Sequence, residues 1–163
     1  MFKGCYTALI SPMKGMHGDT IDFKALGSLV EFQIASGVSG ILAVGTTGES
    51  PTLNWEEHQQ VILKVYECGA NRCAVIAGTG SNCTTETLHA SKHAHKHGVR
   101  NLLLVDPYYN GPSSLEIRKE YVEPVAEALP DAQIVLYTIP GRTGCQLLPE
   151  DIAILHKKYP NVQ

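Results

Sequence analysis

Short apolar runs alternate along the chain with segments in which apolar residues recur every three or four positions. The runs predict five strands, at Gly4 to Met13, Gly40 to Val44, Ala74 to Gly80, Asn101 to Tyr109 and Gln133 to Pro140. Continuous apolar runs are typical of strands that are buried on both faces, as in a parallel sheet covered by helices. The pattern therefore favours an α/β fold.

The segments between the runs predict amphipathic helices. Their apolar positions are Leu26, Leu29, Val30 and Ile34 in the first helix, Val61, Ile62 and Val65 in the second, and Val122, Val125, Ala126 and Leu129 in the fourth. Spacings of three, four and seven residues place such side chains on one helix face, although Ile34 is offset by one position.

Local signals mark where these helices begin and end. Capping boxes are predicted at Asn54 with Glu57 and at Ser113 with Glu116, and helix ends at Gly37, Gly69 and Gly98. Pro124 predicts a kink inside the fourth helix, whereas Pro149 suits the first turn of the fifth.

The order of elements gives five βα units in one domain over residues 1–163, with no linker between them. Such a series forms either an open doubly wound sheet or part of a (β/α)8 barrel. A complete barrel needs roughly 250 residues, so 163 residues would hold only a partial one. In a barrel, the chemistry belongs to the loops that follow the carboxyl ends of the strands.

The composition of the chain limits the classes of protein to which it can belong. The chain is 44% apolar and 18% charged, with a net charge of −3, so we expect neither disorder nor a nucleic-acid partner. No apolar run approaches the roughly 20 residues of a membrane helix, and the start resembles no signal peptide, so we expect a cytoplasmic protein without a membrane partner. The five cysteines form no CxxC pair, which favours reduced thiols over a zinc site.

Two glycine-rich loops invite a nucleotide interpretation that their details disfavour. Gly45-Thr46-Thr47-Gly48-Glu49 offers hydroxyls and backbone N–H groups to a carboxylate, but it has an acid where a phosphate loop needs lysine. Gly78-Thr79-Gly80 has Cys83 at the third glycine position of a dinucleotide fingerprint. Each loop also has the composition of an ordinary strand-ending turn.

Histidines cluster on the third predicted helix. His89 and His93 lie one turn apart, a spacing that holds metals in some proteins, but no acidic third ligand accompanies them and Lys92 and Lys96 share that surface. We interpret the cluster as a solvated helix face with adventitious metal affinity, and we expect no metal or organic cofactor.

Phenols and one guanidinium complete the candidate chemistry. Tyr108, Tyr109 and Tyr137 lie at strand ends, where a phenol that is hydrogen-bonded to another hydroxyl can relay protons. Arg142 follows Pro140-Gly141, and its guanidinium matches a carboxylate in two-point contact. Taken singly, a tyrosine in such a place is more often a packing residue, and Arg142 without its neighbours would be interpreted as a surface residue.

Four motifs occur together at the predicted strand ends: Gly45-Thr46-Thr47-Gly48-Glu49-Ser50, Ala77-Gly78-Thr79-Gly80, Pro107-Tyr108-Tyr109-Asn110 and Tyr137-Thr138-Ile139-Pro140-Gly141-Arg142-Thr143-Gly144. In this order and spacing they resemble the dihydrodipicolinate synthase family of pyruvate-dependent class I aldolases, which is related to N-acetylneuraminate lyase. The resemblance covers the whole chain, with Thr138 standing where many members have asparagine. It implies a (β/α)8 TIM barrel of which this chain holds the first five units.

The resemblance also implies an activity. Members condense pyruvate with L-aspartate-4-semialdehyde through a lysine Schiff base in lysine (diaminopimelate) biosynthesis, as homotetramers and without a cofactor. It assigns a proton relay to Thr46, Tyr109 and Tyr137, with Tyr109 entering a neighbouring subunit's site. It assigns the pyruvate carboxylate to Thr47 and the semialdehyde carboxylate to Arg142. The Schiff-base lysine is expected about three residues beyond Gln163, and neither Lys157 nor Lys158 matches it.

The resemblance further implies an allosteric site for L-lysine as a feedback inhibitor. Its residues would be Ser50, Trp55, His58, Asn82, Glu86 and Tyr108. The alternative is a purely structural role, in which Asn82 and Glu86 begin the third helix, where capping residues and acidic residues are common. Two other functions stay open: a lyase for N-acetylneuraminate or a 2-keto-3-deoxy sugar acid, and a non-catalytic half-barrel.

Overall fold

The structure, a computed structural model, describes residues 2–18 and 20–163. The chain forms two compact units, Met1–Gly78 and Thr79–Gln163. No helix within the described ranges is long and apolar enough to cross a membrane.

The first unit is built on three parallel strands, β1 (Tyr6–Ala8), β4 (Gly40–Ala43) and β5 (Ala74–Gly78). β4 pairs with both others, so that Gly40 lies opposite Tyr6 on one side and Ala74 on the other. Ile41 is fully buried at the centre, as expected for a strand with neighbours on both edges.

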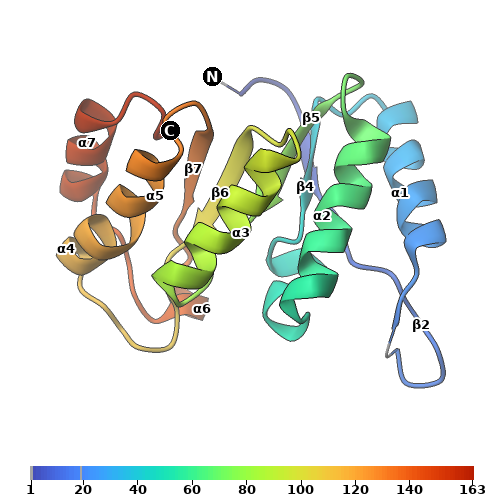
Figure 1. The fold of residues 1–163 in the computed structure, drawn as a ribbon, viewed down its shortest axis with the longest axis horizontal. Helices are drawn as coiled ribbons and strands as arrows, with labels where there is room; N and C mark the ends of the chain where they lie inside the picture. The colour runs from blue at the N-terminus through green and yellow to red at the C-terminus, as the bar shows by residue number, and fades with distance from the viewer. Residues whose placement is uncertain (1, 19) are drawn as a thin grey trace. The chain divides into compact units, whose positions relative to one another are not determined.

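Two helices, α1 (Phe23–Ala35) and α2 (Trp55–Gly69), pack against each other, and α2 covers β4 and β5 (Figure 1). The buried apolar side chains are Leu26 and Val30 in α1 and Val61, Ile62 and Val65 in α2. The predicted apolar faces are thus confirmed, although Leu29 and Ile34 are only half-buried.

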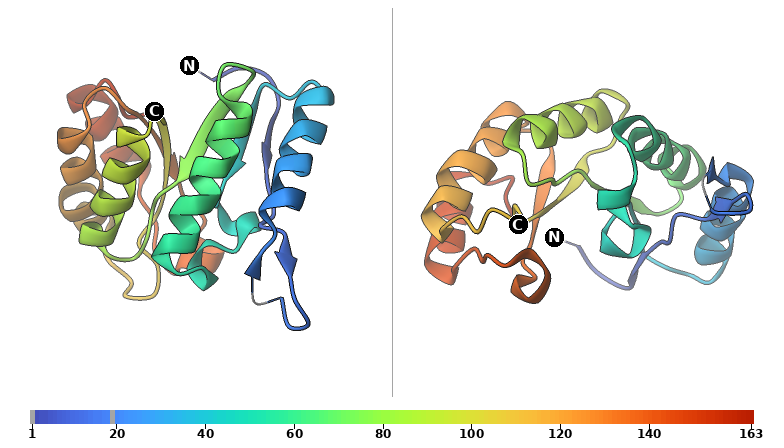
Figure 2. Two further views of the ribbon diagram at one scale, coloured as in Figure 1. Left: turned by 45° about the vertical axis from the view of Figure 1, so that its right-hand side comes forward. Right: turned by 90° about the horizontal axis from the view of Figure 1, so that it is seen from below.

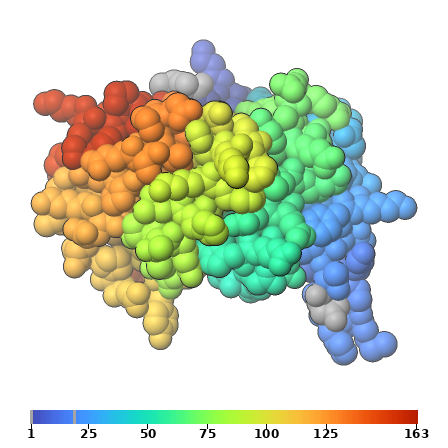
Figure 3. All heavy atoms as spheres, in the orientation of Figure 1, coloured from blue at the N-terminus to red at the C-terminus, as the bar shows by residue number. Residues whose placement is uncertain are grey.

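The predicted strand from Gly4 to Met13 is wrong in extent. The sheet strand ends at Ala8, and Met13 instead belongs to an antiparallel hairpin of β2 (Met13–Lys14) and β3 (Thr20–Ile21). Pro12 lies between the two pieces and has no N–H to donate to a strand neighbour. The hairpin projects from the first unit, visible in blue in Figures 1 and 3.

Two short 3₁₀ turns, η1 (Thr46–Gly48) and η2 (Ser50–Thr52), connect β4 to α2. The predicted capping box at the start of α2 is present, since Asn54 accepts from the Glu57 N–H and Glu57 accepts from the Asn54 N–H. At the end of α1, Gly37 adopts a φ of +80°, as expected for a residue just past a helix.

The second unit contains the parallel strands β6 (Asn101–Val105) and β7 (Gln133–Tyr137), with Leu102 opposite Ile134. Leu102, Leu104 and Ile134 form the interior, each at most 1% exposed. Around them lie α3 (Thr84–Lys96), α5 (Glu123–Ala128), the short α6 (Pro140–Thr143) and α7 (Pro149–Lys158), as the two views of Figure 2 show.

The predicted strands Asn101 to Tyr109 and Gln133 to Pro140 both extend too far. β6 ends at Val105 and β7 at Tyr137, because the chain beyond them turns into polar and proline-containing loops. In the first unit, the predictions for β4 and β5 exceed the strands by one and two residues.

The helix that holds Pro124 does not simply kink. It comprises α4 (Ser114–Glu116), with the predicted capping box of Ser113 and Glu116, then a π-helix, η3 (Ile117–Val122), and then α5. Pro124 cannot donate to the carbonyl of Glu120 four residues earlier, and its ring crowds that carbonyl. The Glu120 carbonyl accepts from the Thr84 hydroxyl at 2.8 Å instead.

Candidate functional site

The candidate loop of the first unit begins with a strained residue. Val44 has a φ of +53°, in the left-handed region that a β-branched residue rarely adopts, and it is only 2% exposed. Its carbonyl oxygen lies so close to Gly78 that a Cβ on Gly78 would meet it at 2.2 Å. Gly78 therefore lets the turn form. Such strain persists where the surrounding structure enforces it, often at functional sites.

Thr46 and Thr47 follow in η1, and both are exposed. The next residue, Gly48, is buried, and its carbonyl accepts from the Ser11 hydroxyl at 2.8 Å. Ser11 thus anchors the loop through Gly48, while both threonines stay exposed. Ser11 belongs to no motif that would single it out in the sequence.

The first unit also brings together Ser50, Trp55 and His58. The Ser50 hydroxyl lies 3.0 Å from Nε2 of His58, and the Trp55 and His58 rings are 4.8 Å apart at their centroids. Burial lowers the pKa of His58 to about 4, so the ring is neutral at pH 7. Its Nδ1 is buried and makes no hydrogen bond within the described residues.

Tyr109 is presented on a strained turn in the second unit. It has a φ of +80° and is 90% exposed, and its N–H donates to the carbonyl of Thr143 at 3.4 Å. Most of its phenol surface therefore lies outside the unit that carries it.

Tyr137 and Arg142 lie close together in sequence but in different surroundings. Tyr137 ends β7 and is half-buried, and its carbonyl accepts from the N–H of Asp106 at 3.1 Å. Arg142 is exposed in α6, whose first residue is Pro140. Within this unit, the loop of Arg142 contacts the segment of Tyr109 through the Thr143 carbonyl.

The second unit also places Glu86 near Tyr108. Burial and, second to it, the negative charge of Glu86 raise the pKa of the Tyr108 phenol. The Ser81 hydroxyl donates to the Glu86 carboxylate at 2.8 Å, and Asn82 is half-buried at the start of this segment. Three of the residues predicted for lysine therefore lie in each unit, and in the second unit Glu86 and Tyr108 lie close together.

Thr79 and Gly80 serve packing. The Thr79 hydroxyl is fully buried and accepts from the Ser91 hydroxyl at 2.9 Å. A Cβ on Gly80 would meet the Val105 nitrogen at 2.6 Å. No dinucleotide role is needed to explain these residues.

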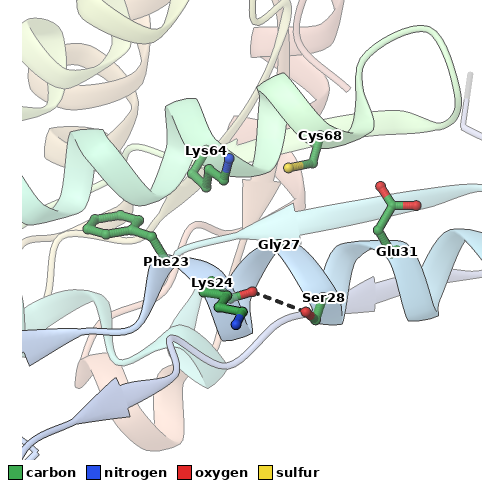
Figure 4. A pocket seen from close by; sticks show the side chains of 7 residues that line it. All are labelled: Phe23, Lys24, Gly27, Ser28, Glu31, Lys64 and Cys68. Carbon is green, nitrogen blue, oxygen red and sulfur yellow. Dashed lines mark hydrogen bonds between the residues drawn. The ribbon is translucent and has the colours of Figure 1, made fainter.

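A surface groove of 440 Å³ lies elsewhere, between α1 and α2 (Figure 4). Its lining residues are Phe23, Lys24, Gly27, Ser28, Glu31, Lys64 and Cys68. None of them is a residue predicted for catalysis, substrate or lysine.

The histidines of α3 stack without forming a larger cluster. The His93 and His97 rings are 4.4 Å apart, and His95 lies 3.0 Å from Asp131. Across residues 2–18 and 20–163, no three His, Cys, Asp or Glu side chains are grouped so that they could hold a metal ion.

Comparison with known proteins covers the whole chain. A family model described as the dihydrodipicolinate synthetase family matches residues 1–163. A 4-hydroxy-tetrahydrodipicolinate synthase from Methanocaldococcus jannaschii is 46% identical over 162 residues, which are 99% of this chain and 54% of that protein. The chain thus spans about half the length of the curated relatives it matches.

Solved structures of dihydrodipicolinate synthases also match this chain. A dihydrodipicolinate synthase from Cyanidioschyzon merolae with lysine bound has a TM-score of 0.93 and 37% identity, over 99% of this chain and 55% of that one. One from Acinetobacter baumannii, chloride-inhibited and complexed with pyruvate, has a TM-score of 0.89 and 39% identity, over 95% of this chain and 52% of that one.

These matches decide between the two architectures that the five βα units allowed. The chain is part of a (β/α)8 barrel and not of an open doubly wound sheet. With the family model matched from the first residue to the last, the chain belongs to the dihydrodipicolinate synthetase family.

Proposed function

We propose that the complete protein containing this chain condenses pyruvate with L-aspartate-4-semialdehyde through a lysine Schiff base, in lysine biosynthesis. The observation that carries the proposal is the family match over all 163 residues, together with relatives named 4-hydroxy-tetrahydrodipicolinate synthase that are 46% identical to this chain. We place the Schiff-base lysine beyond Gln163, and residues 1–163 in one barrel domain.

The chemistry begins when the lysine amine attacks the pyruvate ketone and water leaves, giving a protonated imine. The imine acts as an electron sink, so the pyruvate methyl loses a proton to become an enamine. The enamine carbon forms a bond with the aldehyde carbon, and the aldehyde oxygen takes up a proton. The proposal requires no metal or organic cofactor.

We assign the proton transfers to Thr46, Tyr109 and Tyr137, and the pyruvate carboxylate to Thr47. The exposed hydroxyl of Thr46 and the half-buried phenol of Tyr137 support this assignment. The 90% exposure of Tyr109 supports the insertion of its phenol into a neighbouring subunit of a homotetramer. We also propose a cytoplasmic location, in keeping with five free cysteines.

We propose L-lysine as a feedback inhibitor, bound by Ser50, Trp55, His58, Asn82, Glu86 and Tyr108. The carboxylate of Glu86 suits the ammonium groups of lysine, and Trp55 offers an aromatic face to a cation. The lysine-bound relative from Cyanidioschyzon merolae supports this proposal.

Arg142 provides the decisive test, because a guanidinium is matched to the semialdehyde carboxylate rather than to a polyhydroxylated sugar. In the complete protein, Arg142→Ala should lose about 2 to 4 kcal/mol of semialdehyde recognition, or roughly 30- to 1,000-fold in kcat/KM. Arg100→Ala, which removes another partly exposed arginine, is the control. An unchanged kcat/KM in Arg142→Ala contradicts the assignment.

Borohydride trapping tests the covalent step separately. With pyruvate, the complete protein should be trapped as an adduct on a lysine after residue 163. The 163-residue chain alone should give none, and a stoichiometric adduct on Lys157 or Lys158 would refute the placement of the nucleophile.

A further inference from the structure

Asp106 is a buried carboxylate to which the proposed chemistry gives no role. It follows β6 directly, and its side chain is 3% exposed. Within the described part of the chain it forms no ion pair with a lysine or arginine. Burial raises the pKa of this carboxyl, and hydrogen bonds from Leu147 and Thr138 partly oppose the shift. A buried carboxylate without a cation is costly, so its contacts need an explanation.

Those contacts lie at the two ends of one loop. The N–H of Leu147, at the end of the loop, donates to Oδ2 of Asp106 at 3.3 Å, and the hydroxyl of Thr138, at its start, lies near enough to the Asp106 carboxylate to lower its pKa. The Asp106 N–H also donates to the Tyr137 carbonyl, one residue before Thr138. Asp106 therefore closes the loop 138–147, which contains α6 and Arg142.

Further hydrogen bonds tie the same loop to the residues after Asp106. The Cys145 thiol donates to the Pro107 carbonyl at 3.0 Å, and the Tyr109 N–H donates to the Thr143 carbonyl at 3.4 Å. The Thr143 hydroxyl in turn donates to the carbonyl of Cys145 at 2.9 Å. Arg142 and Tyr109 thus share one supporting network, with Asp106 at its base.

The Leu147 N–H and the Thr138 hydroxyl both approach this side chain, and what they require of it is an accepting oxygen rather than its charge. A carboxylate accepts from both Thr138 and Leu147, whereas the amide of asparagine has one accepting oxygen and must turn its NH₂ group toward one of them. A hydroxyl such as that of Thr138 can rotate and accept from that NH₂ group, but a backbone N–H cannot.

We propose that Asp106 is a positioning residue whose carboxylate holds both ends of the loop 138–147 and so sets Arg142 for the semialdehyde carboxylate. The part of this inference that concerns substrate rests on the proposed function. The part that concerns the loop does not.

Hydrogen exchange in the complete protein tests the loop directly. Asp106→Leu removes both acceptors at similar side-chain length, Thr138→Val removes one donor, and Asp106→Asn keeps one acceptor for Leu147. Ser91→Ala is the control, because it deletes a buried hydrogen bond to Thr79 in the same unit. We expect peptides spanning 138–148 to exchange at least tenfold faster in Asp106→Leu, less so in Thr138→Val, and near the wild-type rate in Asp106→Asn and Ser91→Ala.

Kinetics then test the consequence for substrate. Thr138→Val and Asp106→Leu should raise the KM for the semialdehyde about three- and tenfold, with the pyruvate KM within twofold, and Asp106→Asn should restore most of the loss. The proposal is overturned if exchange at 138–148 is unchanged in both Thr138→Val and Asp106→Leu. If Asp106→Leu fails to fold, unchanged exchange in Thr138→Val alone overturns it. Faster exchange with an unchanged semialdehyde KM overturns the positioning role. If the protein does not consume the semialdehyde at all, the proposed function fails while the exchange result still decides the role of Asp106 in the loop.

Discussion

The left-handed backbone of Val44 predicts that the usual stability order of alanine and glycine is reversed at this position. Val44 has a φ of +53° and is 2% exposed. Val44→Ala and Val44→Gly both remove the buried isopropyl group, so both should be less stable than the wild type. Their difference then reports mainly on the backbone, because only glycine adopts this conformation without strain.

The magnitude follows from two opposing contributions. Left-handed geometry costs an alanine about 1 to 2 kcal/mol that glycine does not pay. The greater freedom of glycine in the unfolded chain costs it about 0.5 to 1 kcal/mol. Val44→Gly should therefore be more stable than Val44→Ala by about 0.75 kcal/mol, the middle of the roughly 0 to 1.5 kcal/mol that the two ranges allow.

Urea unfolding of the complete protein, followed by circular dichroism, measures this difference from the midpoints of the two variants. Ala43→Gly is the matched control, because Ala43 is the preceding residue, fully buried in β4 with an ordinary strand backbone. It should lose about 1 kcal/mol, in the usual order. If Val44→Gly proved less stable than Val44→Ala by about 1 kcal/mol, the loss expected for Ala43→Gly, the strain assigned to Val44 would be refuted.

Three further predictions concern Gly78, His58 and Trp55. Gly78→Ala should cost about 3 kcal/mol or more in urea unfolding, since the new Cβ would meet a backbone oxygen at 2.2 Å, and a loss under 1 kcal/mol would contradict this contact. His58 has a pKa of about 4 when folded and 6.5 as its ordinary value, so the unfolded chain takes up its proton first as pH falls. Stability should therefore drop by about 3 kcal/mol between pH 6.5 and 4, and urea midpoints of His58→Gln across that range should lack this contribution, whereas an unchanged slope would argue against it. Trp55 is the only tryptophan in residues 1–163, and millimolar L-lysine should change the tryptophan fluorescence of the complete protein, whereas no change in either emission or initial rate would exclude lysine at this site.

Much of the fold could be predicted from local patterns because those patterns carry their own physical cause. The apolar face of α2 and the capping box of Asn54 with Glu57 depend on spacing alone, and both are present. The ends of strands depend on partners elsewhere in the chain. β6 ends at Val105, and the next residue, Asp106, accepts a hydrogen bond from the N–H of Leu147, far along the chain. The apolar periodicity of the strand does not indicate that contact.

The candidate site divides in the same way. Thr46, Tyr109 and Arg142 belong to motifs, so the sequence singled them out. Ser11 and Ser81, which hold the Gly48 carbonyl and the Glu86 carboxylate, are isolated serines whose roles appear only when the chain is folded. A supporting residue of this kind has no spacing of its own, and the motif it supports does not reveal it.

The π-helix at Ile117–Val122 also bears on which changes in chain length the second unit tolerates. Each α-helical residue advances the side chains by about 100°, so one inserted residue would normally turn every later side chain away from the core. A π turn takes up one extra residue within the helix, and here Ile117 and Tyr121 within it and Val125 after it are all buried. Removal of one residue from this turn would leave a regular α-helix with the same buried face, whereas a deletion within α5 would rotate the residues that follow it out of the core.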